Sequence, residues 1–175
     1  TLFNLIIGLL EPTSGQIEID GTALKKETRK SWIKNIGYVP QEVYIFNGTI
    51  AENIALGFNH IDKVKIAQLI KWTSLDTWID SLPNGIDTSL HEAGGNLSGG
   101  QKQRIGIARA LYKGASVLLM DEATSALDNN TEQEIIQTIK DLKYSCNNLT
   151  ILSIAHRATS LSYCDRIITI KRDDE

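Results

Sequence analysis

A chain of 175 residues with 42% hydrophobic and 22% charged residues is long enough for one domain with its own core, and its composition is that of an ordinary globular protein. A net charge of −3 with scattered lysines and arginines argues against a nucleic-acid-binding surface. No apolar run approaches the roughly 20 residues of a membrane span, and Cys146 and Cys164 lack the spacing of a metal site.

The first part of the chain alternates between helical and extended patterns. Apolar residues recur at a helical period over 1–10, and a turn containing proline and glycine stops this predicted helix. The alternating stretch 15–21 predicts a short strand, and 28–35 predicts a brief helix. Residues 36–39 predict a strand that ends at a proline, with Gln41 just beyond its end.

The middle of the chain is predicted to be helical, and the last third returns to strands. From about 49 to 112 the apolar spacing is helical. Residues 116–122 form a continuous apolar run that ends in two carboxylates, which is typical of a strand buried on both faces of a parallel sheet. A helix over 131–142 and two further strands over 149–156 and 165–170 complete the pattern.

This order of elements predicts the fold class. Strands alternate with helices at both ends of the chain, which indicates an α/β fold with a parallel sheet. We expect residues 1–48 and 113–175 to form the α/β core. Residues from about 49 to 112 are expected to form an α-helical subdomain inserted into that core.

Polar side chains stand where three of the predicted strands end. Asp121 and Glu122 follow one strand, His156 ends another, and Gln41 lies just beyond a third. In open α/β sheets, ligands bind outside the carboxyl ends of the strands. An aspartate there suits Mg²⁺, the adjacent glutamate can take a proton from water, and a histidine can donate to a phosphate oxygen. Taken singly, the two carboxylates could equally be solvated acids at a strand end, and a lone histidine there is more readily explained as a satisfied histidine at the edge of the core.

A serine followed by two glycines opens the helix predicted near residue 99. Ser98 and Gln101 form the S-x-x-Q pattern of a capping box, which by itself explains a well-capped helix. Gly99 and Gly100 need a further reason, because each glycine costs about 1 kcal/mol relative to alanine in a helix. Bare amides at a helix N-terminus bind anions, and glycine lets an anion approach closely. The pattern therefore favours an anion site.

The same stretch is not a P-loop. Gly95 and Gly100 have the spacing of the G-x-x-x-x-G-K-[ST] motif, but Gln101 stands where the lysine is required. No predicted strand runs directly into it. The chain thus combines a catalytic edge and an anion-binding helix end with no cradle for a nucleotide.

Together these motifs resemble the ATP-binding cassette (ABC) ATPases. In chain order they are similar to the Q-loop ("YVPQ"), the signature motif ("LSGGQ"), the Walker B strand ("VLLMDE"), the D-loop ("SALD") and the switch histidine, His156. The resemblance covers essentially the whole chain. It implies a P-loop NTPase-like parallel-sheet core with an inserted α-helical subdomain.

The resemblance also implies a role for each motif residue in ATP hydrolysis. Glu122 would be the general base or would polarise the attacking water, and Asp121 would hold Mg²⁺ through water. Gln41 would sense Mg²⁺ and the water, and His156 would contact the γ-phosphate of ATP. The remaining site residues would act across a head-to-tail dimer of nucleotide-binding domains. Those that would bind the γ-phosphate on the opposite subunit or reach toward it are Ser98, Gly99, Gly100, Gln101 and Asp128.

Several stretches are similar to exporter-type transporters, among them "IFNGTIAENIALG" and "LPNGIDT". Exporters carry a glycine-glutamate pair before the signature; here Glu92 is present, but His91 replaces the glycine. The opening residues resemble the segment directly after a P-loop lysine, so Thr1 would be the last hydroxyl residue of the Walker A motif, near the α-phosphate. On this interpretation the chain begins inside that motif and is inactive alone. Its partners would be a transmembrane domain and a second nucleotide-binding domain, at the cytoplasmic face of a membrane.

Two alternatives belong to other functional classes. A soluble ABC ATPase acting on DNA would carry a long coiled coil between the Q-loop and the signature, and no heptad run occurs there. Ribosome-acting relatives carry two cassettes in one chain, and this alternative stays open. A non-catalytic cassette would have a degraded Glu122, His156 or signature, and all three are intact.

Overall fold

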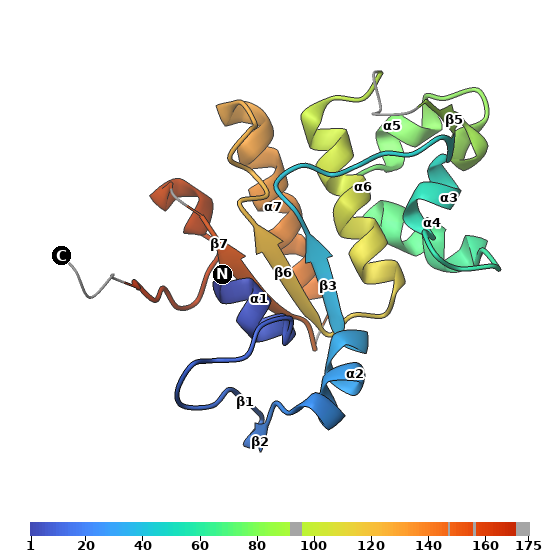
Figure 1. The fold of residues 1–175 in the computed structure, drawn as a ribbon. Helices are drawn as coiled ribbons and strands as arrows, with labels where there is room; N and C mark the ends of the chain where they lie inside the picture. Colours follow the sequence, from blue (N-terminus) through green and yellow to red (C-terminus); the bar gives the residue numbers. More distant parts are fainter. Residues whose placement is uncertain (92–95, 147, 156, 171–175) are drawn as a thin grey trace.

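The computed structural model describes residues 1–91, 96–146, 148–155 and 157–170. Its centre is a three-stranded parallel sheet in the order β3-β6-β7. These strands span Ile36–Val39 (β3), Val117–Asp121 (β6) and Thr150–Ile154 (β7), and they point the same way in Figure 1. The sheet confirms the α/β fold and the parallel strands that the sequence predicts.

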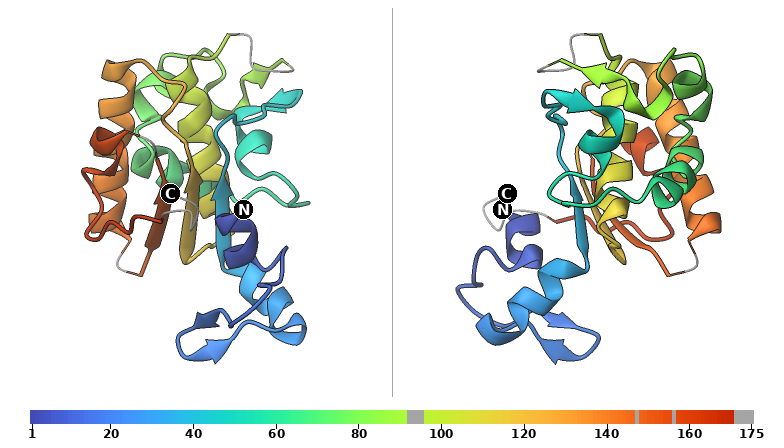
Figure 2. Two further views of the ribbon diagram at one scale, coloured as in Figure 1. Left: turned by 60° about the vertical axis from the view of Figure 1, so that its left-hand side comes forward. Right: turned by 90° about the vertical axis from the view of Figure 1, so that its right-hand side faces the viewer.

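Helices cover both faces of this sheet, as the edge-on view in Figure 2 shows. Helix α1 (Leu2–Ile7) and helix α2 (Lys26–Lys34) lie on one side, and α6 (Gly99–Tyr112) and α7 (Asn129–Ser145) lie on the other. Successive residues of β6 point to opposite faces. Leu118 and Met120 belong to the core under α6 and α7, whereas Leu119 packs with Phe3 of α1. This double burial explains why the β6 sequence is continuously apolar.

The stretch between β3 and β6 is mostly helical and also contains a small antiparallel sheet. Three helices, α3 (Ile50–Ile54), α4 (Lys63–Trp72) and α5 (Asp76–Asp80), precede α6. The sequence pattern did not indicate β4 (Gly48–Thr49), which pairs antiparallel with β5 (Ser89–Leu90) on either side of these three helices in the sequence. The other short elements are β1 (Glu18–Ile19), β2 (Thr22–Ala23) and the 3₁₀ turns η1 (Gly85–Asp87) and η3 (Ala158–Leu161).

The expectation of a last strand over 165–170 is wrong. Residues 166–170 lie outside any strand, and Ile167, Ile168 and Ile170 are 61%, 69% and 68% exposed. A strand needs a neighbouring backbone for its ladder, and in the described part of the chain β7 pairs only with β6. The alternating pattern alone therefore does not place this segment in the sheet. Among the described residues, no helix combines the length and apolarity needed to cross a membrane.

Candidate functional site

The predicted site residues of β3 and β6 meet at the carboxyl ends of these neighbouring strands. Gln41 lies two residues after β3, and its Nε2 donates a hydrogen bond to Ser125 Oγ at 3.0 Å. The Ser125 hydroxyl in turn donates to the main-chain oxygen of Glu122 at 2.9 Å. The structure thus joins Gln41 to the loop that follows Asp121 and Glu122. His156 and Glu92 lie outside the described residues.

Glu122 occupies a strained backbone position at the end of β6. Its φ of 50° is in the left-handed region, which costs a non-glycine residue about 1–2 kcal/mol. Its main-chain N–H donates to the oxygen of Ile154 at 2.9 Å, so the turn is anchored to β7. Strain of this kind concentrates at active sites, where the surrounding structure holds it.

Asp121 has a partner that sequence reasoning missed. The Tyr38 hydroxyl donates to Asp121 Oδ2 at 2.8 Å. Partial burial raises the pKa of Tyr38 to about 12, and the hydrogen bond and the negative charge of Asp121 add to this effect. Tyr38 is in register with Leu119, so Asp121, two residues further along β6, projects on the same side of the sheet. The contact between Tyr38 and Asp121 depends on the register of β3 against β6, which could not be predicted from the sequence.

The turn at Ser98 forms the predicted capping box. The Gln101 N–H donates to Ser98 Oγ at 3.2 Å, and the Ser98 N–H donates to Gln101 Oε1 at 2.9 Å. Among the described residues, no acceptor is found for the main-chain N–H groups of Gly99 and Gly100. The first amides of an α-helix have no partner within the helix, so the start of α6 has the groups that an anion site needs, and the site itself stays a prediction.

Close packing gives the glycine pair a second reason that the sequence did not reveal. A Cβ on Gly99 would lie 2.7 Å from Leu127 Cδ2, and a Cβ on Gly100 would lie 2.6 Å from Thr131 Cγ2. Both distances are too short for carbon atoms in contact. A Cβ at position 99 would therefore require the Leu127 side chain to move, and a Cβ at position 100 would press on Thr131 at the start of α7.

Asp128 caps α7 beside this contact. Its Oδ1 accepts the N–H groups of Asn130 and Thr131 at 3.0 and 3.1 Å. Its Oδ2 accepts the Thr131 hydroxyl at 2.6 Å, and this bond is the main reason that the pKa of Asp128 is lowered. Thr131 thus fixes the Asp128 carboxylate with its hydroxyl and packs against Gly100 with its methyl group.

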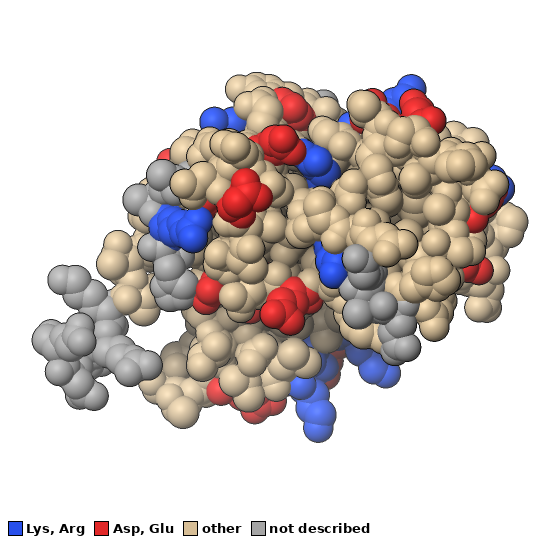
Figure 3. Space-filling model, turned by 90° about the horizontal axis from the view of Figure 1, so that it is seen from above, with Lys and Arg blue, Asp and Glu red and all other residues tan. Residues whose placement is uncertain are grey.

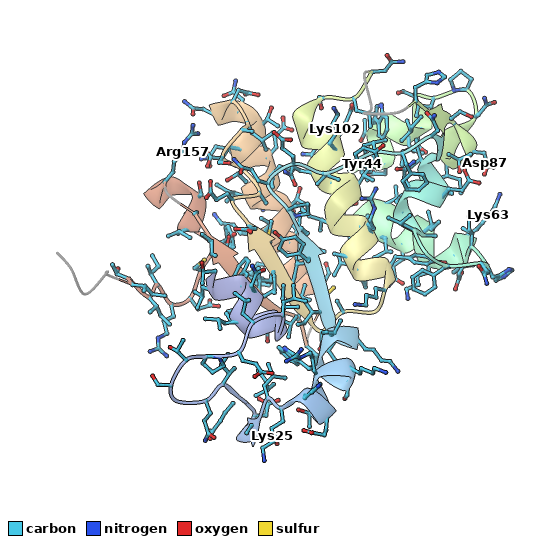
Figure 4. The ribbon with its side chains drawn as sticks, viewed as in Figure 1. Lys25, Tyr44, Lys63, Asp87, Lys102 and Arg157 are labelled. Atoms are coloured by element: carbon cyan, nitrogen blue, oxygen red, sulfur yellow. The ribbon has the colours of Figure 1, made fainter. Side chains whose placement is uncertain are left out.

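A buried carboxylate that the sequence analysis missed ties three segments together. Glu132 is 2% exposed and accepts hydrogen bonds from Thr124 at 3.3 Å, from Arg157 Nη1 at 3.1 Å and from the Ser160 hydroxyl. The Ser160 hydroxyl is the largest cause that lowers the pKa of Glu132; burial opposes it, and Arg157 and Thr124 add to it. Figure 4 shows Arg157 beside the start of α7. The segment after β7 is therefore fastened to α7 and to the loop after β6.

The whole edge can be seen end-on in Figure 3, from the side toward which the strands of Figure 1 point. Acidic and basic side chains are mixed on this face, so it carries no field of one sign. In the described part of the chain, no group of three or more His, Cys, Asp or Glu residues could hold a metal. Mg²⁺ needs no such group, because one or two carboxylates and substrate phosphates hold it, and the Asp121 carboxylate provides the kind of oxygen it prefers.

Comparison with known proteins identifies the family. The family model described as "ABC transporter" matches residues 1–125. The chain belongs to the ABC transporter family. It is 40% identical to an ATP-dependent lipid A-core flippase of Ralstonia nicotianae over 98% of this chain and 29% of the relative. It is 41% identical to the mitochondrial iron-sulfur clusters transporter ATM1 of Debaryomyces hansenii, over 98% of this chain and 25% of the relative.

A solved structure supports the same assignment at the level of the fold. A bacterial Atm1-family ABC exporter with ATP bound matches with a TM-score of 0.78 and 39% identity, over 91% of this chain and 28% of that chain. The fold is therefore that of an ABC ATPase, with a P-loop NTPase-like core. The chain spans less than a third of the length of these curated relatives.

Proposed function

We propose that this ABC transporter chain is part of an ATP-hydrolysing domain that powers export across a membrane. The observation that carries the proposal is the connection of Gln41 through Ser125 to the Asp121–Glu122 turn at the strand ends. Relatives named as a flippase and as a transporter support a part in transport, and the solved structure named as an ABC exporter supports its direction. The domain would work at the cytoplasmic face of the membrane, bound to a transmembrane domain in the same chain or in a partner subunit.

Each residue of the edge has a defined task in this proposal. Glu122 accepts a proton from the attacking water or polarises that water, and Gln41 positions it. Asp121 holds Mg²⁺ through water, and His156 donates to the γ-phosphate. Mg²⁺, when bound, neutralises the charge that develops on the phosphate oxygens. Phosphoryl transfer depends mainly on positioning and charge stabilisation, which a strained and anchored Glu122 turn is suited to provide.

The second half of each site comes from another nucleotide-binding domain. The amides of Gly99 and Gly100, with the capping box formed by Ser98 and Gln101, bind the γ-phosphate of ATP held on the opposite domain. Asp128 meets that domain from the start of α7. The P-loop lysine is supplied by a Walker A motif whose last hydroxyl is Thr1, the residue that precedes α1. ATP then closes the dimer and hydrolysis opens it, which is a two-state change that a transporter can use.

The test is ATP-driven dimer formation by a nucleotide-binding domain that contains this chain and its P-loop. Glu122→Gln should form dimers with MgATP, because the substitution removes the base but leaves the binding groups. Glu27→Gln, an exposed change on α2, is the matched control and should stay monomeric during turnover. Light scattering checks the result, and monomers of Glu122→Gln at saturating MgATP would contradict the shared site.

A further inference from the structure

Gln103 is a polar residue buried where α6 crosses the segment after β3. Its side chain is 4% exposed, and its Nε2 donates to the main-chain oxygen of Gln41 at 2.7 Å and approaches that of Pro40 at 3.5 Å. The hydrogen bond from Gln103 holds the backbone of Gln41, whose side chain reaches Ser125 beside the Glu122 turn. Gln103 lies two positions after Gln101, in the same helix that begins at the anion site.

Two further residues of α6, at intervals of three, hold the same segment. Gly106 lies so close to Val43 that a Cβ on it would come within 2.6 Å of Val43 Cγ2. Arg109 donates from Nη1 to the main-chain oxygen of Tyr44 at 3.0 Å. Residues three apart lie on neighbouring positions of one helix surface, so α6 follows this segment over nearly two turns. Figure 4 shows Tyr44 beside α6.

The contacts form a continuous series from α6 to the carboxylate turn. Gln103 binds the Gln41 backbone, the Gln41 side chain binds Ser125, and Ser125 binds the main-chain oxygen of Glu122. No step in the series exceeds 3.0 Å between donor and acceptor. A displacement of α6 would therefore move Gln41 relative to Glu122.

Glutamine is energetically unfavourable at position 103 if the side chain serves only to fill space. In the described part of the chain, its Oε1 is buried without a hydrogen-bond partner. A buried polar atom without a partner destabilises the folded state, whereas an apolar side chain of similar shape does not. Methionine would fill a similar volume and remove the unpaired Oε1, but it would leave the Gln41 main-chain oxygen without the Gln103 donor. The specific contribution of glutamine at this position is therefore its bond to the Gln41 backbone.

We propose that Gln103 is a positioning residue for ATP hydrolysis, which holds Gln41 against the Glu122 turn and links it to the anion-binding end of α6. The inference rests on the proposed function, because it assigns Gln103 a part in the same reaction. It concerns the site within one chain and is independent of the transported substrate.

The test compares substitutions at Gln103 in the full-length protein. Gln103→Met removes both the unpaired Oε1 and the bond to the Gln41 oxygen, so it should change the thermal midpoint little, lower kcat by about 10- to 100-fold and change KM for ATP by less than about threefold. Gln103→Glu keeps the size but loses the donor, so it should lower kcat as well. Gln68→Met, the same change at an exposed position of α4, is the control and should leave kcat unchanged.

A double-mutant cycle with Gln41→Ala distinguishes positioning from a structural effect. If Gln103 acts through the Gln41 side chain, Gln103→Met should have little further effect on kcat in the Gln41→Ala background. The inference would be overturned if Gln103→Met lowered kcat equally in both backgrounds, or if it left kcat unchanged. Hydrolysis by the wild type would still uphold the proposed function in that case. Absence of Glu122-dependent hydrolysis in the wild type would instead overturn the proposed function, and this inference with it.

Discussion

Glu132 shows at the scale of one residue how a buried charge can organise a site. Its carboxylate accepts three side-chain donors from two segments that are separate in sequence, and one donor is Arg157. Removing one partner of a buried charged network leaves the others unsatisfied, which destabilises the fold. Because Arg157 directly follows His156 in the sequence, this carboxylate also fixes the chain next to a predicted catalytic residue.

Replacing this carboxylate by an amide should therefore lower the stability of the domain. We expect Glu132→Gln to reduce the free energy of unfolding by about 1–3 kcal/mol at pH 7. The matched control is Glu134→Gln on the same helix, whose 63% exposed carboxylate pairs with Arg104 and should contribute less than about 1 kcal/mol. Urea unfolding of a nucleotide-binding domain that contains this chain measures both changes.

The pH dependence of this effect has a definite sign. The pKa of Glu132 is lowered in the folded state, so its stabilisation is fully present above the ordinary value of 4.5 and is lost as the pH falls through the folded value. The stabilities of the wild type and Glu132→Gln should converge on acidification below about pH 4.5. A difference that stays constant from pH 7 into this range would show that the charge of Glu132 is not what stabilises the fold.

At the scale of elements, the contact between the start of α6 and the start of α7 depends on the absence of a side chain. Alanine at position 100 would gain about 1 kcal/mol in helix propensity. It would also press on Thr131 Cγ2, and overpacking of this kind costs about 1–3 kcal/mol. We expect Gly100→Ala to destabilise the domain on balance, because the α7 backbone limits how far Thr131 can withdraw.

Thr131→Ser makes this prediction specific, since it removes the methyl group and keeps the hydroxyl that binds Asp128. Gly100→Ala should be less destabilising in the Thr131→Ser background than alone, by about 1 kcal/mol. Thermal unfolding of the four proteins in this cycle provides the measurement. Additive effects would mean that the methyl contact does not determine the need for glycine.

The elements also show what the sequence could and could not predict. β6 and α7 were predictable because each carries an uninterrupted pattern. The positions of Asp121, Glu122 and Gln41 near strand ends were predictable for the same reason: Asp121 ends β6, Glu122 follows it, and Gln41 lies two residues after β3. The strand expected over 165–170 failed, since a local pattern says nothing about a ladder partner. Tyr38, Gln103 and Glu132 were missed because their roles depend on strand register and helix contacts. Glu132 did leave one signal: it is an acidic residue on the apolar stripe of α7.

At the scale of the whole molecule, our proposal assigns the phosphate-binding groups of this chain to two different nucleotides. The Asp121–Glu122 turn and the amides of Gly99 and Gly100 both lie at the carboxyl end of the sheet, but in our proposal they serve different ATP molecules. The sequence contains no G-x-x-x-x-G-K-[ST] motif, whose backbone and lysine would hold the β- and γ-phosphates.

We therefore expect the 175-residue chain by itself to show no response to MgATP. A ligand present at 100 times its Kd stabilises a folded protein by about 2.7 kcal/mol, which raises the thermal midpoint of a domain of this size by several degrees. The midpoint of this chain should stay constant within error on adding millimolar MgATP, whereas a domain that also contains the P-loop should gain this shift. The domain that contains the P-loop should hydrolyse ATP, and the 175-residue chain should not. Stabilisation of the shorter chain by MgATP, or hydrolysis by it that Glu122→Gln abolishes, would show that this edge binds ATP without a Walker A motif.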